Sequence, residues 1–262
     1  MKRLIQFSKY QGTGNDFVLI DNRLNHFPKD NQSLVARLCD RKFGIGADGL
    51  ILIEHHDTQD FSMVYYNADG AESTMCGNGG RCLVAFAQQL NMINHSGSFM
   101  AVDGVHHAVI EDDQVKLQMK DVSDVQVVNG AYFLDTGSPH HVAIVDAVLD
   151  LNVPEVGASI RYGQYGTQGA NVNFVTPNED GSFFVRTYER GVEAETLSCG
   201  TGVTAVAIAM HYAQKTKHTA IDVQTPGGSL QVSFESSAQG YEKIFLTGGA
   251  VHVFDGSIVI ND

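Results

Sequence analysis

Two cysteines of this chain stand in the same local sequence, each followed by a glycine, a small polar residue and a second glycine. Cys76 lies in MCGNG at 75–79, and Cys199 lies in SCGTG at 198–202. A long apolar run follows each segment, so a glycine-rich turn is expected to lead into a buried helix. The backbone N–H groups and dipole at a helix start favour negative charge and lower the pKa of a thiol there. The pattern predicts two reactive thiols, which we expect to face each other across one cleft.

A pair of thiols suits proton transfer at a carbon acid. One thiolate removes a proton from one face of the carbon, and the other thiol donates a proton to the opposite face. The two sulfurs would share a single negative charge and titrate as a coupled pair. N–H groups at the helix starts would stabilise the charge that develops beside the reacting carbon. Removing an α-proton from an amino acid without a cofactor also requires that such a site exclude water.

The other cysteines and the paired histidines carry weaker signals. Cys39 and Cys82 lie within apolar helical patterns, and we expect them to fill the core. The Cys-x-x-Cys spacing of disulfide oxidoreductases does not occur in the sequence. Histidine doublets at 55–56 and 106–107 have no further ligands at a metal-binding spacing. We expect both doublets at the surface and predict no metal site.

The elements that must position the two cysteines also occur twice. A strand is expected at 61–66, and the polar connection 67–72 leads from it to Cys76. A second strand is expected at 183–188, and the connection 189–195 leads to Cys199. The order of strand, polar connection, cysteine and buried helix therefore indicates a two-fold internal repeat.

The rest of the sequence is rich in short strands bounded by turn residues. One further helix is expected over Gln32–Lys42, with Asp30 or Asn31 as its N-cap. Strands are expected at 17–20, 50–53, 131–134, 221–224, 229–234 and 243–246. We therefore predict an α+β fold of two halves, residues 1–122 and residues 123–249, with the boundary placed from the repeat.

The amino-acid composition and net charge indicate which kinds of molecule the protein is expected to bind. The 262 residues are 43% hydrophobic and 18% charged, and this is ordinary for a globular protein with a substantial core. A net charge of −13 argues against nucleic acid or an anionic membrane surface as a partner. No signal peptide or membrane span is recognisable, and the sparse cysteines favour a reduced, cytoplasmic setting.

Four segments together resemble the diaminopimelate epimerase family. They are GTGNDFV at 12–18, GIGADG at 44–49, MCGNGGRC at 75–82, and YERG at 188–191 with CGTG at 199–202. The similarity runs in the family's order from about residue 7 to residue 202, and the chain length agrees with that of the family. Any one motif is weak evidence, whereas the combination is highly specific.

The resemblance implies an isomerase that interconverts LL- and meso-2,6-diaminopimelate without pyridoxal phosphate, in lysine and peptidoglycan precursor biosynthesis. It implies two pseudo-symmetric halves, each a curved, mostly antiparallel sheet wrapped around a central helix. The active site would lie in the cleft between them, and a C-terminal strand within 250–262 would complete the first half. It further implies a homodimer and no cofactor.

The resemblance also implies which residues of this sequence form the active site. Cys76 and Cys199 match the two catalytic cysteines, and His140 and Glu189 match residues that assist them or orient the substrate ammonium. Substrate-binding positions match Asn15, Asn67, Gly77, Asn78, Asn171, Glu189, Arg190, Gly200 and Thr201. Backbone N–H groups of 77–78 and 200–201 would take the reacting carboxylate, while the asparagines and Arg190 hold the distal end.

Three positions depart from the family pattern. Ser138 stands where an asparagine is frequent, and Gly49 stands where some members carry glutamine. The connection from Glu189 to Cys199 is one residue longer than usual and contains Glu193 and Glu195. These departures leave the reaction type unchanged and bear on the choice of substrate.

Other functions are also compatible with these sequence motifs. A related racemase or epimerase would act on proline, hydroxyproline or histidine, although an unmatched side chain would leave the polar groups for the distal end unpaired. A thiol redox or binding protein would instead form a reversible disulfide between Cys76 and Cys199. A pyridoxal-phosphate racemase needs a Schiff-base lysine, and all nine lysines lie outside the glycine-rich motifs.

Overall fold

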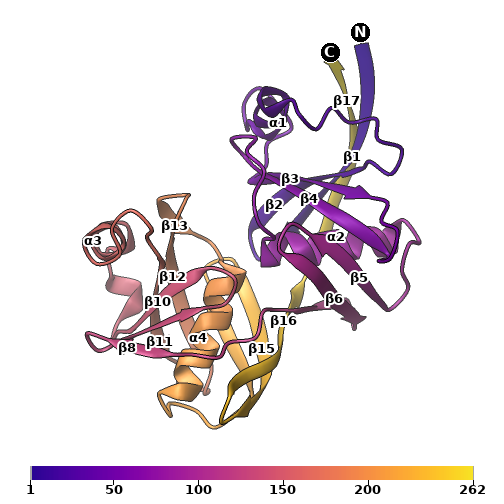
Figure 1. Ribbon diagram of the computed structural model, residues 1–262. Coiled ribbons are helices and arrows are strands. Elements are labelled where there is room, and N and C mark those ends of the chain that lie inside the picture. Colours follow the sequence, from indigo (N-terminus) through magenta and orange to yellow (C-terminus); the bar gives the residue numbers. More distant parts are fainter. Residues whose placement is uncertain (1, 262) are drawn as a thin grey trace. The chain divides into compact units, whose positions relative to one another are not determined.

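A computed structural model describes residues 2–261, and it divides into two compact units (Figure 1). The first unit combines residues up to Leu117 with those from Gly249 onward, and the second is Gln118–Gly248. Across these described residues, no helix is long and apolar enough to cross a bilayer. Each unit is a sheet with helices on its two faces.

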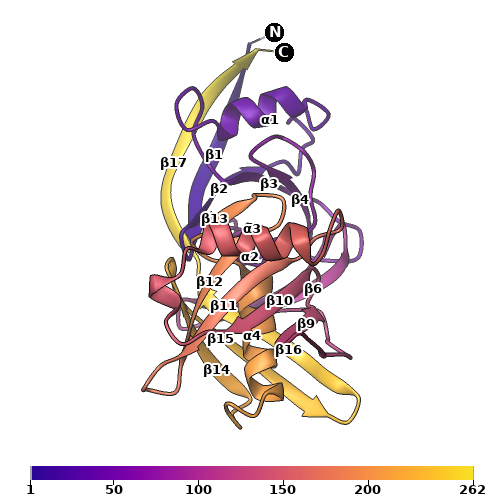
Figure 2. The same ribbon diagram turned by 90° about the vertical axis from the view of Figure 1, so that its left-hand side faces the viewer.

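The first unit contains eight strands in the order β17-β1-β2-β3-β4-β5-β6-β7. Neighbouring strands are antiparallel except for the parallel pairs β2–β3 and β4–β5. β1 and β17 lie side by side in both views, and they are the longest strands of the unit (Figures 1 and 2). The strands are β1 (Lys2–Gly12), β2 (Asn15–Asp21), β3 (Gly49–Glu54), β4 (Phe61–Asn67), β5 (Ser96–Ala101), β6 (Gly104–Glu111), β7 (Gln114–Gln118) and β17 (Val251–Asn261).

Two helices pack on opposite faces of this sheet. α1 (Gln32–Cys39) packs its apolar side on Leu50 and Leu52, whereas Ile51, between them on β3, lies beside Gly79 of α2 (Gly77–Gln89). Alternate residues of a strand point to opposite faces, so one strand serves both helices. α2 also contacts β1, β2, β6 and β17, and the sheet wraps around this central helix.

The second unit repeats this plan in the order β8-β9-β10-β11-β12-β14-β15-β16. Here β10–β11 and β12–β14 are the parallel pairs, and the short β13 pairs with the end of β12. The strands are β8 (Gln126–Val128), β9 (Ala131–Asp135), β10 (Pro139–Ile144), β11 (Asn171–Pro177), β12 (Phe183–Glu189), β13 (Ala194–Thr196), β14 (Ala220–Thr225), β15 (Gly228–Ser237) and β16 (Gly240–Gly249).

The helices of the second unit occupy the same two faces. α4 (Gly200–Tyr212) is the central helix, and its residues 202–210 are all buried, as expected for a helix that is apolar on every side. α3 (Val153–Gly163) follows the 3₁₀ turn η1 (Val148–Asp150) and covers the opposite face through contacts with Val172, Phe174 and Tyr188. The two units confirm the predicted α+β class, with two similar halves and a central helix in each.

Some expectations for individual elements need correction. The helix expected over Gln32–Lys42 ends at Cys39, because Asp40 is extended and its carboxylate accepts the N–H groups of Lys42 and Phe43. The expected cap is correct, since the Asn31 side chain accepts from the Leu34 N–H. His106 is not simply a surface residue: its ring stacks on Phe99 at 5.3 Å, and its side chain is only 12% exposed. Cys39 and Cys82 are buried, as predicted.

Candidate active site

Cys76 and Cys199 occupy the same structural position in the two units. Each is the N-cap of a thirteen-residue central helix and has an extended backbone. Each cysteine carbonyl accepts the first helical hydrogen bond, from Gly80 N at 2.7 Å and from Val203 N at 2.8 Å. The first N–H groups of a helix have no partner within it, and neither helix has an acidic residue in its first turn. Both cysteines therefore stand at helix starts suited to a negative charge.

The glycine three positions after each cysteine lets the helix start approach its sheet. A Cβ on Gly202 would lie 2.4 Å from Asn173 Oδ1, and Cys199 Sγ lies 3.4 Å from the same point. At Gly79 the nearest atom to such a Cβ is Ile51 Cδ1, at 3.0 Å. The second unit thus has a fixed polar group beside its cysteine, and the first has the end of a flexible apolar side chain.

We expect Gly202→Ala to destabilise the protein by about 1–3 kcal/mol, because the new methyl group collides with a hydrogen-bonded amide. The equivalent Gly79→Ala is expected to cost less, since Ile51 can rotate and alanine is the better helix former by up to about 1 kcal/mol. Urea unfolding of both variants beside the unmodified protein measures the difference. Equal losses in the two variants would contradict the assignment of Asn173 as the rigid neighbour.

In the first unit, the side chains of Asn15 and Asn78 are joined by a hydrogen bond. Asn78 Nδ2 donates to Asn15 Oδ1 at 2.5 Å, and Asn15 Nδ2 donates to Asp48 Oδ2 at 3.0 Å. Asp48 is in turn paired with Arg41 at 2.7 Å. The structure therefore brings together the predicted residues 15 and 78 at the start of α2. Asn67 is exposed at the end of β4.

Gly49, the first residue of β3, lies opposite Asn67 at the end of the antiparallel neighbour β4. A Cβ at this position would lie 2.6 Å from both Tyr65 Cε2 and the Tyr66 carbonyl oxygen. No larger residue fits this backbone, so the glycine at this position is required by packing.

In the second unit, Ser138, Asn171 and Arg190 form one polar cluster. Asn171 Nδ2 donates to Ser138 Oγ at 2.9 Å, and Asn171 Oδ1 accepts from the Arg190 N–H at 2.9 Å. The Arg190 guanidinium reaches Ser138 Oγ at 3.4 Å and the Gln168 carbonyl at 3.0 Å, and the residue is exposed. The Ser138 hydroxyl therefore ties together the two predicted binding residues.

His140 is fully buried on β10, and its orientation is set by Asn173. Asn173 Nδ2 donates to the His141 carbonyl at 3.0 Å and lies 3.2 Å from His140 Nδ1. Because the carbonyl can only accept, it fixes the amide orientation, so His140 Nδ1 is the acceptor and Nε2 carries the hydrogen. Asn173 Oδ1 accepts from Thr187 Oγ1 at 2.9 Å.

Burial determines the charge state of this histidine. Loss of hydration lowers the pKa of His140 to about 3, and the nearby Asp135 offsets only part of that effect. His140 is therefore neutral, and its Nε2 is buried without a hydrogen-bond partner in the described structure. A buried N–H of this kind is available as a donor to a group that enters the site.

Glu189 and the long connection after it are held by hydrogen bonds and ion pairs. Glu189 Oε2 accepts from Thr196 Oγ1 at 2.9 Å. Glu193 pairs with Arg161 at 3.2 Å, and Glu195 pairs with Arg186 at 2.6 Å. The two acidic residues of the longer connection are thus engaged in structural ion pairs. At the helix start, Thr201 Oγ1 lies 3.5 Å from Cys199 Sγ.

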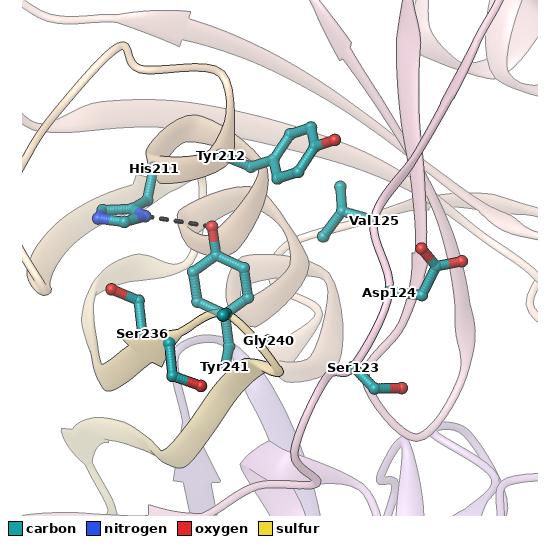
Figure 3. Close-up of a pocket in the computed structure, with 10 residues that line it drawn as sticks. Ser123, Asp124, Val125, His211, Tyr212, Ser236, Gly240 and Tyr241 are labelled. Carbon is teal, nitrogen blue, oxygen red and sulfur yellow. Dashed lines mark hydrogen bonds between the residues drawn. The ribbon is translucent and has the colours of Figure 1, made fainter.

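A cavity of about 380 Å³ lies at the other end of α4 (Figure 3). His211 and Tyr241 line it and are joined by a hydrogen bond of 3.1 Å, and Asp124 lines its rim. Cys199 is about 18 Å away along the helix, at 1.5 Å per residue. None of the site residues expected from the sequence lines this cavity. Within residues 2–261, no three His, Cys, Asp or Glu side chains are grouped to hold a metal ion.

Comparison with solved structures identifies the class of fold. A PhzF-family phenazine biosynthesis protein of Bacillus anthracis superposes with a TM-score of 0.76 at 14% identity, covering 98% of this chain and 100% of that one. A hydroxyproline epimerase of Agrobacterium vitis gives 0.73 at 15% identity, covering 99% and 94%. The fold is the two-unit fold that these proteins share.

Sequence comparison identifies the family within that class. The family model for diaminopimelate epimerase matches residues 7–125 and 132–253. A diaminopimelate epimerase of Flavobacterium psychrophilum is 56% identical over 252 residues, covering 95% of this chain and 98% of that protein. One of Aquifex aeolicus is 38% identical over 275 residues, covering 97% and 98%. This chain belongs to the diaminopimelate epimerase family and is an isomerase.

Proposed function

We propose that this protein interconverts LL- and meso-2,6-diaminopimelate through two cysteines and without a cofactor, in lysine and peptidoglycan precursor biosynthesis. The observation that carries the proposal is the equivalent placement of Cys76 and Cys199 at the N-caps of the two buried central helices. Family membership and the close similarity to a named epimerase support the substrate.

The reaction requires both thiols to reach one α-carbon from opposite faces. One cysteine is a thiolate and removes the α-proton, which becomes its S–H proton. The electron pair left on carbon is delocalised into the carboxylate, whose oxygens are held by N–H groups of 77–78 and 200–201. The other thiol donates its proton to the opposite face, and the configuration inverts. In the reverse direction the two cysteines exchange roles.

The remaining polar residues would recognise the substrate. Arg190, Asn171 and Ser138 form a cluster that can bind a carboxylate at the distal end, and Asn15 and Asn67 would complete that recognition. Glu189 would take an ammonium group. Neutral His140, as an Nε2–H donor, would assist the cysteine chemistry.

We also propose a cytoplasmic homodimer. Several large apolar side chains on the paired strands β1 and β17 are exposed, and a second copy of the chain would cover them. They are Leu4, Val251, Val253, Phe254 and Val259. A reducing compartment suits a mechanism that needs both thiols reduced.

Incubation of the reduced protein with LL-diaminopimelate in D₂O, without pyridoxal phosphate, tests the proposed reaction. We expect the meso isomer with solvent deuterium at the inverted carbon, read by chiral chromatography and mass spectrometry. Proline, hydroxyproline and histidine serve as comparison substrates and are expected to show no exchange. Turnover of one of these, with none of diaminopimelate, would overturn the substrate assignment.

A further inference from the structure

Arg81 is the largest fully buried side chain among the described residues. It lies on α2, five residues after Cys76, and is 0% exposed. Its Nη2 donates to Thr13 Oγ1 at 3.0 Å and its Nη1 donates to the Gly77 carbonyl at 3.4 Å. Its Nε is buried with no hydrogen-bond partner, and no carboxylate is within ion-pair distance among the described residues.

A cation in this position requires an anion nearby. Guanidinium stays protonated in proteins, so Arg81 cannot relieve its burial by losing a proton. An uncompensated buried charge strongly destabilises the folded protein. The start of α2 adds further positive potential, and no acidic residue stands in its first turn. Both features favour an anion at the position of Cys76.

The other ionisable groups around α2 do not supply that anion. Burial raises the pKa of Cys82 to about 12 and that of Tyr10 to about 12, so both are neutral. Asp48 is separated from Arg81 by the side chains of Asn15, Asn78 and Thr13, which connect the two through hydrogen bonds.

The remaining acidic groups on the strands that pack against α2 have partners of their own. These groups are Asp16 with Lys9 and Arg41, Asp21 with Arg23, Glu54 with Lys29, Glu111 with Lys116, and Asp255 with Ser8 and His252. Asp103, in the turn before β6, pairs with His106 and also accepts the Met75 N–H. Cys76 is therefore the group left to carry the compensating charge.

The second unit lacks this cation. Counting from the two cysteines, the position of Arg81 in α2 corresponds to Thr204 in α4. Thr204 is buried and its hydroxyl donates to the Gly200 carbonyl at 3.0 Å. Asn173, which lies beside Gly202 together with Cys199 Sγ, contacts neutral His140, and Asp135 raises and Arg190 lowers the pKa of that histidine. At the position five residues after the cysteine, the two helix starts thus differ by one buried positive charge.

We propose that Arg81 is the counter-ion that holds Cys76 as the thiolate in the free protein, while Cys199, beside neutral Thr204, remains the thiol. Arg81 acts through Cys76, because its positive charge stabilises the negative charge on that sulfur. It is therefore a positioning residue. The inference rests on the proposed role of Cys76 as an acid–base group, but it concerns the protein without substrate. The thiol proton leaves to solvent, and the single negative charge of the pair resides in the first unit.

Alkylation by iodoacetamide measures this directly, because only the thiolate attacks: the S–C bond forms and iodide leaves. The reagent is neutral, so Arg81 does not attract it. Initial rates from pH 5 to pH 10, resolved by peptide mass spectrometry, give a midpoint for each cysteine. We expect Cys76 to have the lower midpoint, by at least about one pH unit.

Variants then assign the effect to the guanidinium. Arg81→Met is expected to raise the Cys76 midpoint by about one to three pH units, with the Cys199 midpoint unchanged, and Arg81→Lys to restore part of the shift. Thr204→Val, at the equivalent position of α4, is the matched control and should move neither midpoint.

The outcomes separate clearly. An unchanged Cys76 midpoint in a folded Arg81→Met protein would overturn the proposal. If that variant does not fold, equal midpoints for the two cysteines in the unmodified protein would overturn it as well. The measurement contains no diaminopimelate, so its result stands apart from the outcome of the turnover assay.

Discussion

Replacing either Cys76 or Cys199 by alanine is expected to lower the rate of epimerisation by about 10²- to 10⁴-fold, which is the range for loss of a general acid or base. Each direction of the reaction needs one thiolate and one thiol, so neither variant should invert the α-carbon in either direction. The rate is measured with LL- and with meso-diaminopimelate by chiral chromatography.

The same variants should still exchange the α-hydrogen of one isomer with solvent. The remaining cysteine can remove a proton and return a deuteron on the face it reaches, and the configuration is then retained. Cys76→Ala and Cys199→Ala should exchange opposite configurations in D₂O. Cys39→Ala, a buried cysteine at the end of α1, serves as a control that should epimerise normally. Inversion by either catalytic-cysteine variant at a rate within about tenfold of the unmodified protein would contradict a two-base reaction.

The second large effect concerns acid stability. Burial lowers the pKa of His140 to about 3 and that of His141 to about 4, while an unfolded histidine titrates near 6.5. Between these values the unfolded chain binds more protons than the native protein, so stability is fully present above pH 6.5 and is lost as the pH falls. Each histidine contributes about 1.4 kcal/mol per pH unit, and the pair contributes about 2.7 kcal/mol per pH unit.

Urea unfolding between pH 6 and pH 4.5 measures this slope. His141→Phe keeps a ring beside Tyr165 and removes one titrating group, so the slope should fall by about half. His218→Gln, at an exposed position, is the matched control and should leave the slope unchanged. Asp16, whose pKa is lowered to about 2 by Arg41 and Lys9 against the effect of burial, loses its contribution only below this range. A free energy of unfolding that is constant across the range would contradict neutral burial of the two histidines.

The helix starts were predictable because their determinants are local. A cysteine followed by Gly-x-Gly and an apolar run predicts a helix start and a buried helix, and both buried helices were correctly predicted. The glycines expected to form a turn before each helix instead belong to its first turn, and the cysteine is the N-cap. The end of α1 was not correctly predicted, because apolar periodicity does not determine it. The helix ends where the Asp40 carboxylate accepts two N–H groups of the following turn.

The polar network of the second unit could not be derived from the pattern. The bond from Asn173 to His140 depends on the parallel register of β10 and β11, in which His140 is opposite Asn171. Register between strands separated by about thirty residues is a tertiary property. The available signal was alternation: Asn173 is two residues from Asn171 and so lies on the same face of its strand. In the same way, only the packed structure shows that no carboxylate among residues 2–261 is paired with Arg81.

The pairing of β1 with β17 has a consequence for how the chain folds during synthesis. The second unit is one continuous segment and can complete its sheet as soon as residue 248 has left the ribosome. The first unit must keep the edge of β1 unpaired until β17 is made, about 250 residues later. Exposed strand edges invite association with other chains. Selection for solubility should therefore act on β1 through the nascent chain, independently of catalysis.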